Sequence, residues 1–539
     1  MSMSIQPPRP VAPDRAAEYV ARGYWNDRRL RGGLEAAALR HPDALAVADN
    51  RGALSWSQLT SLVSAGVGRL RSAGLETGQA ALLITGNTSE GVVAYHSLQR
   101  AGLLAVLLDR RCGEADVRVA KQSVPVSIVI APREEVVRLG AAVGSTSVLP
   151  LEDFSVEGGA GAPRLQWEEP DRDAVAVLLF TSGTTKRPKG VTHSINTLTC
   201  AAQNMAALNC VDRSTVLFLV SPLMSITGVM QMHLAADQHC MVVLEDAFDP
   251  DTSLARINEW GATHLGGAPV IVERLLQAAD ARREDRLALR ALALGGAMLP
   301  RPLLERATDE YGIQIVRVYG SSEAPNASGS QPTDDRDSRL GNDGAPTPGL
   351  EVQVGSSEHH QEGMLRGPGM FLGYIDDADN DAAFDDDWYR TGDLIEFADG
   401  RITVIGRLKE VVIRNGFKIS LAEVEVALAG HSALEEFATF GVPDRTTGER
   451  LAVAIVPKSG VGVTLEHVLE HLRSAGMPPR KLPEQLFIWD EPLPRTASGK
   501  VIRSRLLMDA PSKNSVVAER IRAEEGNVPE PCGRNGGRK

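Results

Sequence analysis

Residues 178–191, LLFTSGTTKRPKGV, join an apolar strand to a loop that holds hydroxyls, glycines and two lysines. Backbone N–H groups beside glycines, hydroxyls and ammonium groups are the donors that hold a polyphosphate. The loop is not of the GxxxxGK[ST] type, because no GK[ST] triplet follows its first glycine at the required spacing. A polar surface turn is the alternative interpretation. The candidate phosphate-binding residues are Thr181, Ser182, Gly183, Thr184, Thr185 and Lys189.

Lysine is scarce in this sequence, and its distribution is uneven. Only ten of the 57 basic residues are lysine, and five of those ten lie in the segments 178–194, 406–425 and 494–503. A lysine is a compact point charge that arginine does not replace where it must meet a phosphate or a carboxylate. These three segments are therefore candidates for a charged site.

Four further segments combine hydroxyls, carboxylates and cations. They are Tyr319-Gly320-Ser321-Ser322-Glu323, Tyr389-Arg390-Thr391-Gly392-Asp393, Gly406-Arg407-Leu408-Lys409-Glu410 and Pro494-Arg495-Thr496-Ala497-Ser498-Gly499-Lys500. Each alone has an ordinary interpretation, such as a solvated carboxylate or a turn cap. Together with the phosphate loop, and in this order, they resemble the motifs of the adenylate-forming superfamily, which includes acyl- and aryl-CoA ligases, adenylation domains and luciferases. The resemblance covers nearly the whole chain.

The resemblance implies a nucleotide-binding role for several of these side chains. Glu323 would hold Mg²⁺ against the phosphates of ATP, since a hard cation prefers oxygen ligands. Ser322 stands where the family usually has threonine and keeps a hydroxyl near the α-phosphate. Asp393 would accept hydrogen bonds from the ribose hydroxyls with Arg407 beside it as a donor fork, and Tyr319 would stack on adenine.

The resemblance also implies a reaction in two steps. A carboxylate attacks the α-phosphorus of Mg·ATP and forms an acyl-adenylate with release of pyrophosphate, and Lys500 stabilises the charge that develops. The small domain then rotates about Lys409, which brings residues 414–419 to the site so that a thiol can attack the acyl carbon. The cofactors implied are ATP, Mg²⁺ and CoA, or the phosphopantetheine of a carrier protein. Catalytic roles are expected for Lys500, Glu323 and Lys189.

The substrate pocket is expected to have small or apolar walls. The segment 221–228, SPLMSITG, resembles a pocket motif in which many relatives carry histidine where this chain has Ser225. The segments 22–25 and 193–198 resemble the branch that contains aryl-acid AMP ligases and alicyclic or medium-chain acyl-CoA ligases. The candidate pocket residues are Ser225, Ile226, Thr227, Gly228, Gly296 and Ser321. None is an aspartate that could pair with an amino group or an arginine that could pair with a second carboxylate, so an aryl, alicyclic or short- to medium-chain acid is favoured over an amino acid.

Three alternatives stay open at the level of sequence. A non-catalytic family member acting as an interaction subunit would be expected to lose Lys500, Glu323 or Asp393, and all three are present. An enzyme of natural-product biosynthesis could load an acyl carrier protein in trans, because no carrier domain follows residue 510. The acid could also be unusual, nitrite included. CoA is favoured as the thiol because the branch resemblance favours it.

The elements that must position these residues follow an α/β pattern. Helical and strand periodicities alternate as far as INEWGATHLGGAPVIVERLLQAAD, which favours layers built on largely parallel sheets. From about Gly341, short strands and Gly/Pro/Asp turns indicate a β-rich subdomain, and beyond Lys409 a small α+β unit follows. We therefore predict a disordered N-terminus at 1–15, a large ATP- and acid-binding domain at 16–407, a small mobile domain at 408–510, and a largely disordered tail at 511–539.

Composition excludes several other classes of protein. The 539 residues carry a formal net charge of −12 without a long block of like charge, which disfavours nucleic acid as a partner. The prolines of MSMSIQPPRPVAPDR do not suit a signal peptide, and no stretch is apolar for long enough to span a membrane. The five cysteines form no CxxC pair, which indicates reduced thiols and a cytoplasmic location. Monomer and homodimer both remain open.

Overall fold

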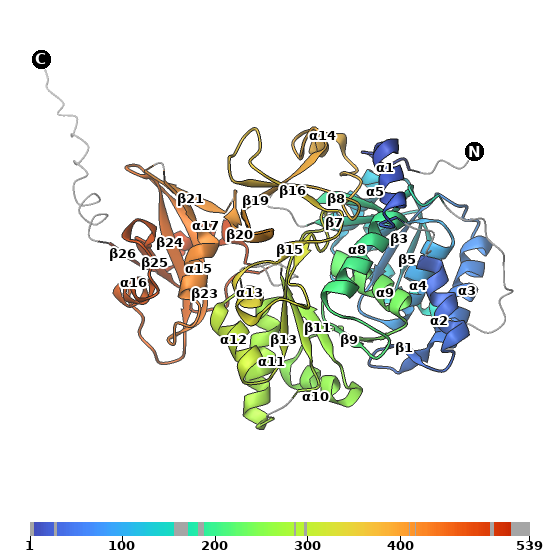
Figure 1. Ribbon diagram of the computed structural model, residues 1–539, viewed down its shortest axis with the longest axis horizontal. Helices are drawn as coiled ribbons and strands as arrows, with labels where there is room; N and C mark the ends of the chain where they lie inside the picture. Colours follow the sequence, from blue (N-terminus) through green and yellow to red (C-terminus); the bar gives the residue numbers. More distant parts are fainter. Residues whose placement is uncertain are drawn as a thin grey trace, which may run out of the picture. The chain divides into compact units, whose positions relative to one another are not determined.

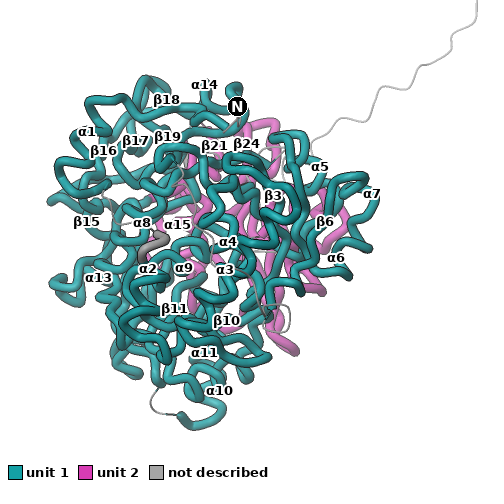
Figure 2. The backbone as a smooth tube through the Cα atoms, turned by 90° about the vertical axis from the view of Figure 1, so that its right-hand side faces the viewer, with its two compact units in different colours: residues 1–404 teal, residues 405–539 magenta. Residues whose placement is uncertain are grey.

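The computed structural model describes residues 5–25, 30–155, 171–181, 188–284, 287–295, 299–408, 410–415, 417–495 and 501–518. The chain divides into two compact units, residues 1–404 and 405–539, which are coloured separately in Figure 2 and are described here each by itself. The division falls within a strand, a few residues before the boundary at 407 that the sequence predicts.

The first unit contains a sheet of nine strands whose central strands are parallel. Its order is β15-β14-β13-β12-β11-β9-β10-β1-β2. The strands are β1 (Leu45–Ala48), β2 (Ala53–Ser55), β9 (Val216–Leu219), β10 (Met241–Leu244), β11 (His264–Gly267), β12 (Ala291–Gly295), β13 (Gln314–Tyr319), β14 (Ser328–Gly329) and β15 (Ala345–Pro346). Strands β1, β9 and β10 are short apolar runs, as expected for parallel strands that are covered on both faces.

A second sheet of six strands carries the phosphate loop. Its order is β6-β5-β3-β4-β7-β8, parallel except that β8 runs antiparallel to β7. The strands are β3 (Ala80–Thr85), β4 (Leu104–Asp109), β5 (Val126–Ala131), β6 (Ser147–Pro150), β7 (Val175–Thr181) and β8 (Lys189–Ser194). A third, antiparallel sheet has the order β16-β17-β19-β18, with β20 paired to β19. Its strands are β16 (Glu351–Val354), β17 (Glu362–Arg366), β18 (Phe384–Asp385), β19 (Trp388–Ala398) and β20 (Arg401–Arg407).

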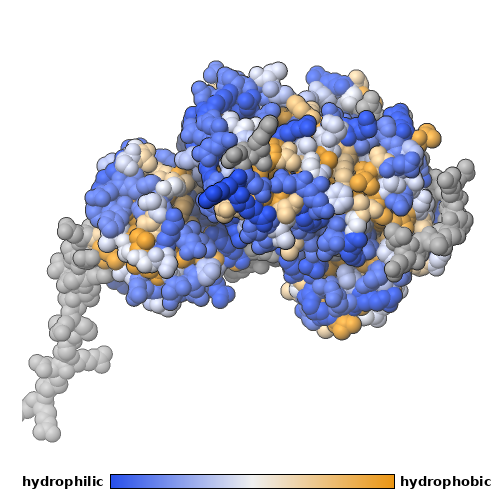
Figure 3. Space-filling model, turned by 90° about the horizontal axis from the view of Figure 1, so that it is seen from below, coloured by the Kyte–Doolittle hydropathy of each residue, from blue (hydrophilic) through white to orange (hydrophobic). Residues whose placement is uncertain are grey.

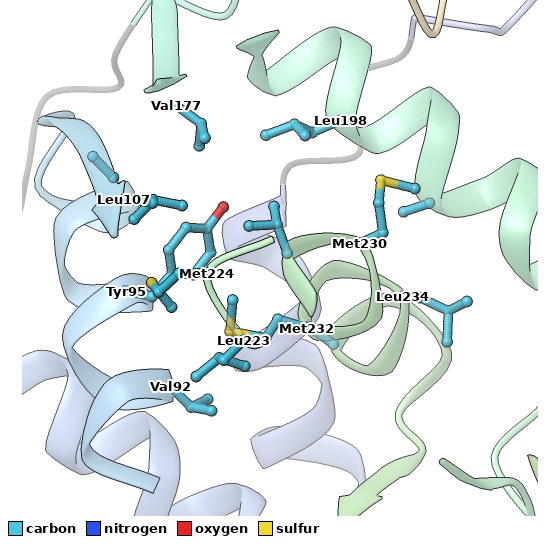
Figure 4. Close-up of a cluster of buried hydrophobic side chains, with 14 of the residues drawn as sticks. Val92, Tyr95, Leu107, Val177, Leu198, Leu223, Met224, Met230, Met232 and Leu234 are labelled. Carbon is cyan, nitrogen blue, oxygen red and sulfur yellow. The ribbon is translucent and has the colours of Figure 1, made fainter. Parts of the chain in front are cut away.

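Helices form the layers of this unit, as Figure 1 shows. They are α1 (Pro13–Ala21), α2 (Leu30–Arg40), α3 (Trp56–Ser72), α4 (Ser89–Arg100), α5 (Glu114–Ser123), α6 (Arg133–Arg138), α7 (Gly140–Val143), α8 (Ile195–Leu208), α9 (Ile226–Gln238), α10 (Pro250–Trp260), α11 (Pro269–Arg282), α12 (Arg301–Asp309), α13 (Arg336–Gly341) and α14 (Asp377–Asp381). The main core joins residues of both large sheets to α4, α8 and α9, so these helices lie between the sheets. In Figure 4, Tyr95 of α4, Leu198 of α8 and Met230 of α9 converge with Leu107 and Val177 of the second sheet.

The second unit is a small α+β domain built on one sheet. The sheet order is β22-β21-β24-β25-β26, and β23 pairs with β24. The elements are β21 (Val411–Arg414), β22 (Phe417–Ser420), α15 (Leu421–Leu428), β23 (Leu434–Asp444), β24 (Gly448–Pro457), α16 (Leu465–Ser474), β25 (Gln485–Ile488), α17 (Arg503–Asp509) and β26 (Asn514–Val517). A large α/β unit followed by a small α+β unit is the fold class that the sequence predicts.

Both chain ends contain more structure than the sequence suggests. Within the N-terminal segment expected to be disordered, the Arg9 N–H donates to the Leu372 carbonyl at 2.9 Å and the Arg9 guanidinium lies 4.2 Å from the centre of the Phe384 ring. Helix α1 begins at Pro13, which supplies the fixed backbone angle of a first helical turn. Residues 514–517 form β26 against β25. These contacts depend on distant partners, so local composition does not reveal them.

One face of the molecule is mainly polar (Figure 3). On the face shown in Figure 3, hydrophilic residues predominate and hydrophobic ones occur in small groups. The most exposed large apolar side chains of the described residues are those of Leu39 and Val137, at 84% and 83%. Within the described ranges, no helix combines the length and the apolar character needed to cross a bilayer.

Candidate functional site

The phosphate loop connects the two strands of a hairpin. Thr181 at the end of β7 pairs with Lys189 at the start of β8, so both candidate residues lie at the base of the loop. Ser182, Gly183, Thr184 and Thr185 lie outside the described residues. The Lys189 Nζ lies 3.5 Å from Asp379 Oδ1 and 4.4 Å from the centre of the Tyr374 ring. A carboxylate and an aromatic face thus hold this ammonium at the hairpin base.

Glu323 is the buried carboxylate of the site. Its side chain accepts a hydrogen bond from the Tyr374 hydroxyl, 2.7 Å from Oε1, and its carbonyl accepts one from the Phe371 N–H at 2.8 Å. Among the described residues no partner bonds the second oxygen, Oε2. Because Tyr374 touches both Glu323 and Lys189, one tyrosine ties the candidate metal ligand to the candidate phosphate ligand.

A tight turn before Glu323 is fixed from two sides. The Ser321 hydroxyl accepts hydrogen bonds from the N–H groups of Glu323 and Ala324, both at 3.2 Å. The His193 Nε2 donates to the Ser322 carbonyl at 2.7 Å, so Nδ1 is the acceptor and the Thr197 hydroxyl donates to it at 3.0 Å. Burial lowers the pKa of His193 to about 4, which keeps the imidazole neutral and this arrangement intact near neutral pH.

Asp393 projects from a bulge in the third sheet. The register of β17 and β19 shifts so that residues 391–393 oppose a single residue, Gly363, and a bulge of this kind redirects a side chain. Gly392 has a φ of +69°, which favours glycine, and its N–H donates to the buried Glu362 at 3.1 Å. The Tyr319 hydroxyl donates to Asp393 Oδ2 at 3.0 Å. The candidate adenine platform and the candidate ribose ligand are therefore in direct contact.

The first unit thus brings four of the predicted nucleotide residues into one network. Lys189, Tyr374 and Glu323 form one part, and Tyr319 and Asp393 form the other. The segment 319–323 connects the two parts. Arg407 ends β20 in the second unit, where it is exposed. Lys409 and Lys500 lie outside the described residues.

The carboxylate set of the site is compatible with Mg²⁺ bound together with ATP. Within the described part of the chain, no three His, Cys, Asp or Glu side chains cluster closely enough to hold a metal by themselves. Mg²⁺ commonly uses one or two protein carboxylates and takes its other ligands from phosphates and water. Glu323, with Oε1 fixed by Tyr374, provides one such carboxylate.

The first turn of α9 contains the candidate acid-binding segment. Ser225 is the N-cap: its hydroxyl accepts from the Gly228 N–H at 3.3 Å and donates to the Pro222 carbonyl at 2.7 Å. A Cβ added at Gly228 would lie 2.4 Å from the Leu223 carbonyl oxygen. The side of Gly228 on which a side chain would project is therefore packed against backbone and does not line a substrate pocket. Ile226 and Thr227 are half-buried and stay candidates, and Gly296 lies outside the described residues.

Asn87 fixes the entrance to α9. Its side-chain amide donates to the carbonyls of Ser221 and Glu245 at 2.9 and 2.8 Å and accepts from the Leu223 N–H at 2.6 Å.

A cavity of about 10 Å³, room for roughly one water molecule, lies beyond Glu323 between α8 and the segments 324–327, 347–350 and 368–370. It is too small to hold an acid.

The sequence alone did not identify several residues that organise this site. Tyr374, Asp379, Glu362 and Asn87 carry no motif of the phosphate-loop kind, and their partners are distant in the chain. His193 begins the segment 193–198, which the sequence comparison with one branch of the family singles out, but its bond to the distant Ser322 carbonyl could not be predicted from that segment.

Comparison with known proteins identifies two family domains. Residues 34–375 match the family described as AMP-binding enzyme, and residues 423–500 match the AMP-binding enzyme C-terminal domain. A medium-chain fatty-acid–CoA ligase of Escherichia coli (strain K12) is 29% identical over 92% of this chain and 93% of its own length. A 2-succinylbenzoate–CoA ligase of Bacillus licheniformis is 28% identical over 86% and 97%. A salicylyl-CoA synthase / salicylate adenylyltransferase of a Streptomyces species is 28% identical over 92% and 96%.

Solved structures share the fold. The o-succinylbenzoate CoA synthetase of Bacillus subtilis, in complex with its acyl-adenylate intermediate, has a TM-score of 0.78 at 23% identity and covers 88% of this chain and 97% of its own. ATP-bound MatB from Rhodopseudomonas palustris has a TM-score of 0.79 at 24% identity, with 89% and 98% covered. These similarities confirm the predicted α/β architecture.

Proposed function

Because the chain belongs to the AMP-binding enzyme family, we propose that it activates a small carboxylic acid with Mg·ATP and transfers the acyl group to the thiol of CoA. The acid carboxylate attacks the α-phosphorus, and pyrophosphate leaves. The CoA thiolate then attacks the acyl carbon of the adenylate, and AMP leaves. The relatives named as acid–CoA ligases support this reaction type.

The observation that carries the proposal is the network around Tyr374 and Tyr319. It holds a cation, Lys189, a buried carboxylate, Glu323, and a second carboxylate, Asp393, within one short set of contacts. These are the groups that ATP requires: a positive charge for phosphate, a ligand for its metal, and an acceptor for ribose hydroxyls. Bound Mg²⁺ would neutralise phosphate charge.

Each of these side chains has a defined task in the proposed site. Glu323, whose Oε1 is fixed by the Tyr374 hydroxyl, would hold the metal, and Lys189, which now pairs with Asp379, would bind a phosphate oxygen. Asp393 accepts hydrogen bonds from the ribose. We assign Lys500 to charge stabilisation during adenylation and Lys409 to the rotation that precedes thioester formation, on the motifs alone.

The acid is proposed to be aryl, alicyclic or of short to medium chain length, and the thiol to be CoA. Relatives whose names include medium-chain fatty acid, 2-succinylbenzoate and salicylate support this range. Loading of an acyl carrier protein would use the same adenylate and differs only in the thiol. A cytoplasmic location, and a role in natural-product biosynthesis, remain predictions from the sequence.

Pyrophosphate exchange across an acid panel tests the proposal. The panel holds aryl, alicyclic and linear acids and nitrite, and each active acid is then incubated with CoA or with a phosphopantetheinylated carrier protein and analysed by mass spectrometry. We expect acid-dependent exchange, its loss in Glu323→Gln, and an acyl-CoA product. Acid-independent or absent exchange would contradict adenylation, and acylation of the carrier alone would replace CoA as the thiol.

A further inference from the structure

Small residues leave one face of the nine-stranded sheet open beside α9. Gly266 of β11 pairs with Ala293 of β12, and Gly295 lies on the same face two residues further along β12. All three are only half-buried although they belong to central strands. On the opposite face Leu265, Leu292 and Leu294 are buried in a core cluster. We call Gly266, Ala293 and Gly295 the sheet floor.

Gly266 and Gly295 differ in how closely the chain packs against them. A Cβ added at Gly266 would find its nearest atoms at 3.6 Å, the Ala293 carbonyl oxygen and the Gln231 Nε2, which is ordinary contact. At Gly295, by contrast, a Cβ would lie 2.2 Å from the Val318 carbonyl oxygen. Gly295 is therefore required by packing, whereas the half-buried Gly266 lies within contact distance of the Gln231 side chain of α9.

Gln231 is a buried amide with unused hydrogen-bonding capacity. It is 5% exposed, and within the described ranges its Oε1 has no hydrogen-bond partner. The buried amide of Asn87, in the same unit, is bonded at both ends. Leaving a buried polar atom unpaired is costly, so such an atom calls for a partner that the chain does not supply.

The location of Gln231 relates it to the reacting end of the site. Strands β12 and β13 end at Gly295 and Tyr319, and the turn that carries Glu323 follows directly. Gly266 and Ala293 lie before the ends of their strands, so Gln231 lies deeper along the floor than the strand ends. Ligands of parallel sheets bind at the carboxyl ends of the strands. An acid with its carboxylate near Glu323 would direct its distal end along the floor toward Gln231.

We propose that Gln231 is a specificity-determining residue that hydrogen-bonds a hydroxyl group on the distal end of the acid. The inference rests on the proposed function and narrows its substrate class to hydroxylated aryl or alicyclic acids. A hydroxyl suits an amide because it can donate to Oε1 and accept from Nε2. A charged ammonium would instead need a carboxylate, and the partner offered here is neutral.

Matched acid pairs that differ by one hydroxyl test this inference. Benzoate is compared with 3- and 4-hydroxybenzoate, and cyclohexanecarboxylate with its 3- and 4-hydroxy derivatives, by pyrophosphate exchange at fixed ATP. We expect the wild-type enzyme to prefer a hydroxylated member of a pair by about 10- to 100-fold in kcat/KM, and Gln231→Leu to abolish or reverse that preference with the KM for ATP unchanged.

A control and a second variant complete the design. Gln238→Leu makes the same substitution near the end of α9, where the amide donates to Asp237, and should leave the preference intact. Gly266→Val keeps the Gln231 amide but places a side chain against it, since the Gln231 Nε2 would lie 3.6 Å from the new Cβ, and should reduce kcat/KM for the hydroxylated acids most. This variant also gives an answer if Gln231→Leu fails to fold.

The possible outcomes separate this inference from the proposed function. If no acid supports exchange, the proposed function is wrong and the inference falls with it. If acids are activated but the wild-type enzyme shows no hydroxyl preference, or if Gln231→Leu and Gly266→Val both leave that preference unchanged, the proposed function stands and the inference is wrong.

Discussion

At the scale of single residues, the site depends on tyrosine hydroxyls that fix carboxylates. Tyr374 donates to Glu323 and Tyr319 donates to Asp393, so each carboxylate has one oxygen held by the protein. A carboxylate oriented in advance loses less entropy when it meets a metal or a ribose. The ring of Tyr374 adds a second effect, because the Lys189 ammonium lies over its face.

Tyr374→Phe should weaken use of Mg·ATP while keeping the ring beneath Lys189. Loss of one hydrogen bond to a charged group amounts to about 1.5–3 kcal/mol, or roughly 10- to 150-fold in kcat/KM for Mg·ATP. The measurement is a titration with Mg²⁺ at fixed ATP. The Mg²⁺ concentration that Tyr374→Phe needs for half-maximal activity should be higher than that of the wild type. Tyr311→Phe, which removes a hydroxyl bonded to Asp280 on the surface, is the control. An unchanged Mg²⁺ requirement in Tyr374→Phe would show that Glu323 needs no such support.

At the scale of elements, helix starts and buried imidazoles determine how the layers hold the site. Ser225 caps α9, the helix that carries Thr227 and Gln231, and Asn87 fixes the segment before it. Between α4 and α9, the His96 ring lies 5.6 Å from the Tyr95 ring and 6.2 Å from the His233 ring, and the Tyr95 hydroxyl bonds His233 at 2.6 Å. Both features link stability to the position of the acid-binding segment.

Ser225→Ala should destabilise the protein through the lost cap, and Ser225→Asn should not. Removing a serine N-cap costs about 1 kcal/mol, whereas asparagine caps equally well. Urea unfolding of the three proteins is the measurement. The substitution Ser225→His would restore the residue of many relatives and is expected to narrow the range of acids that are activated. Because it also removes the serine cap, its effect on activity must be compared with that of Ser225→Ala. Equal midpoints for all three proteins would mean that the cap contributes nothing.

Buried histidines should make the protein sensitive to mild acid. Burial lowers the pKa of His96 to about 4 and that of His193 to about 4, from 6.5, and the pKa of His233 is lowered well below 6.5. Below pH 6.5 these histidines bind protons in the unfolded chain but stay neutral in the folded chain. The free energy of unfolding that is present above pH 6.5 is therefore lost as the pH falls toward 4. Each group contributes a slope of about 1.4 kcal/mol per pH unit.

Urea unfolding at several pH values between 7 and 5 measures this slope. In His96→Leu, one buried titratable group is removed, so the free energy of unfolding should fall less steeply with decreasing pH than in the wild type. A slope that is the same in both proteins would contradict the assignment to His96.

At the scale of the whole molecule, two compact units match the two family domains, residues 34–375 and 423–500. In the proposed two-step reaction, rotation of the small unit would exchange the groups around one bound intermediate. The proposed two half-reactions therefore make opposite demands on Lys500 and Lys409.

Lys409→Pro should retain adenylation and lose thioester formation, because proline fixes a backbone angle that rotation must change. Lys500→Ala is the matched counterpart: adenylation should fall by about 10²- to 10³-fold, while conversion of a supplied acyl-adenylate persists. Pyrophosphate exchange and single-turnover thioester formation measure the two steps separately. If each variant loses both steps to the same extent, the division of roles between Lys409 and Lys500 is wrong.

The amino-acid sequence by itself determined the chemistry and the class of fold. The phosphate loop, the segment 319–323 and the Thr-Gly-Asp turn could be identified because each motif is a short run of residues, and the alternating periodicities indicated α/β layers. Only the tertiary structure decided which side chains support them. Tyr374 meets Glu323 across 51 residues, and His193 meets the Ser322 carbonyl across 129. Gln231 reaches Gly266 because α9 packs against this sheet and β11 lies beside β9 in it. Strand order and helix packing bring these residues together, and no local segment of the sequence predicts either of them.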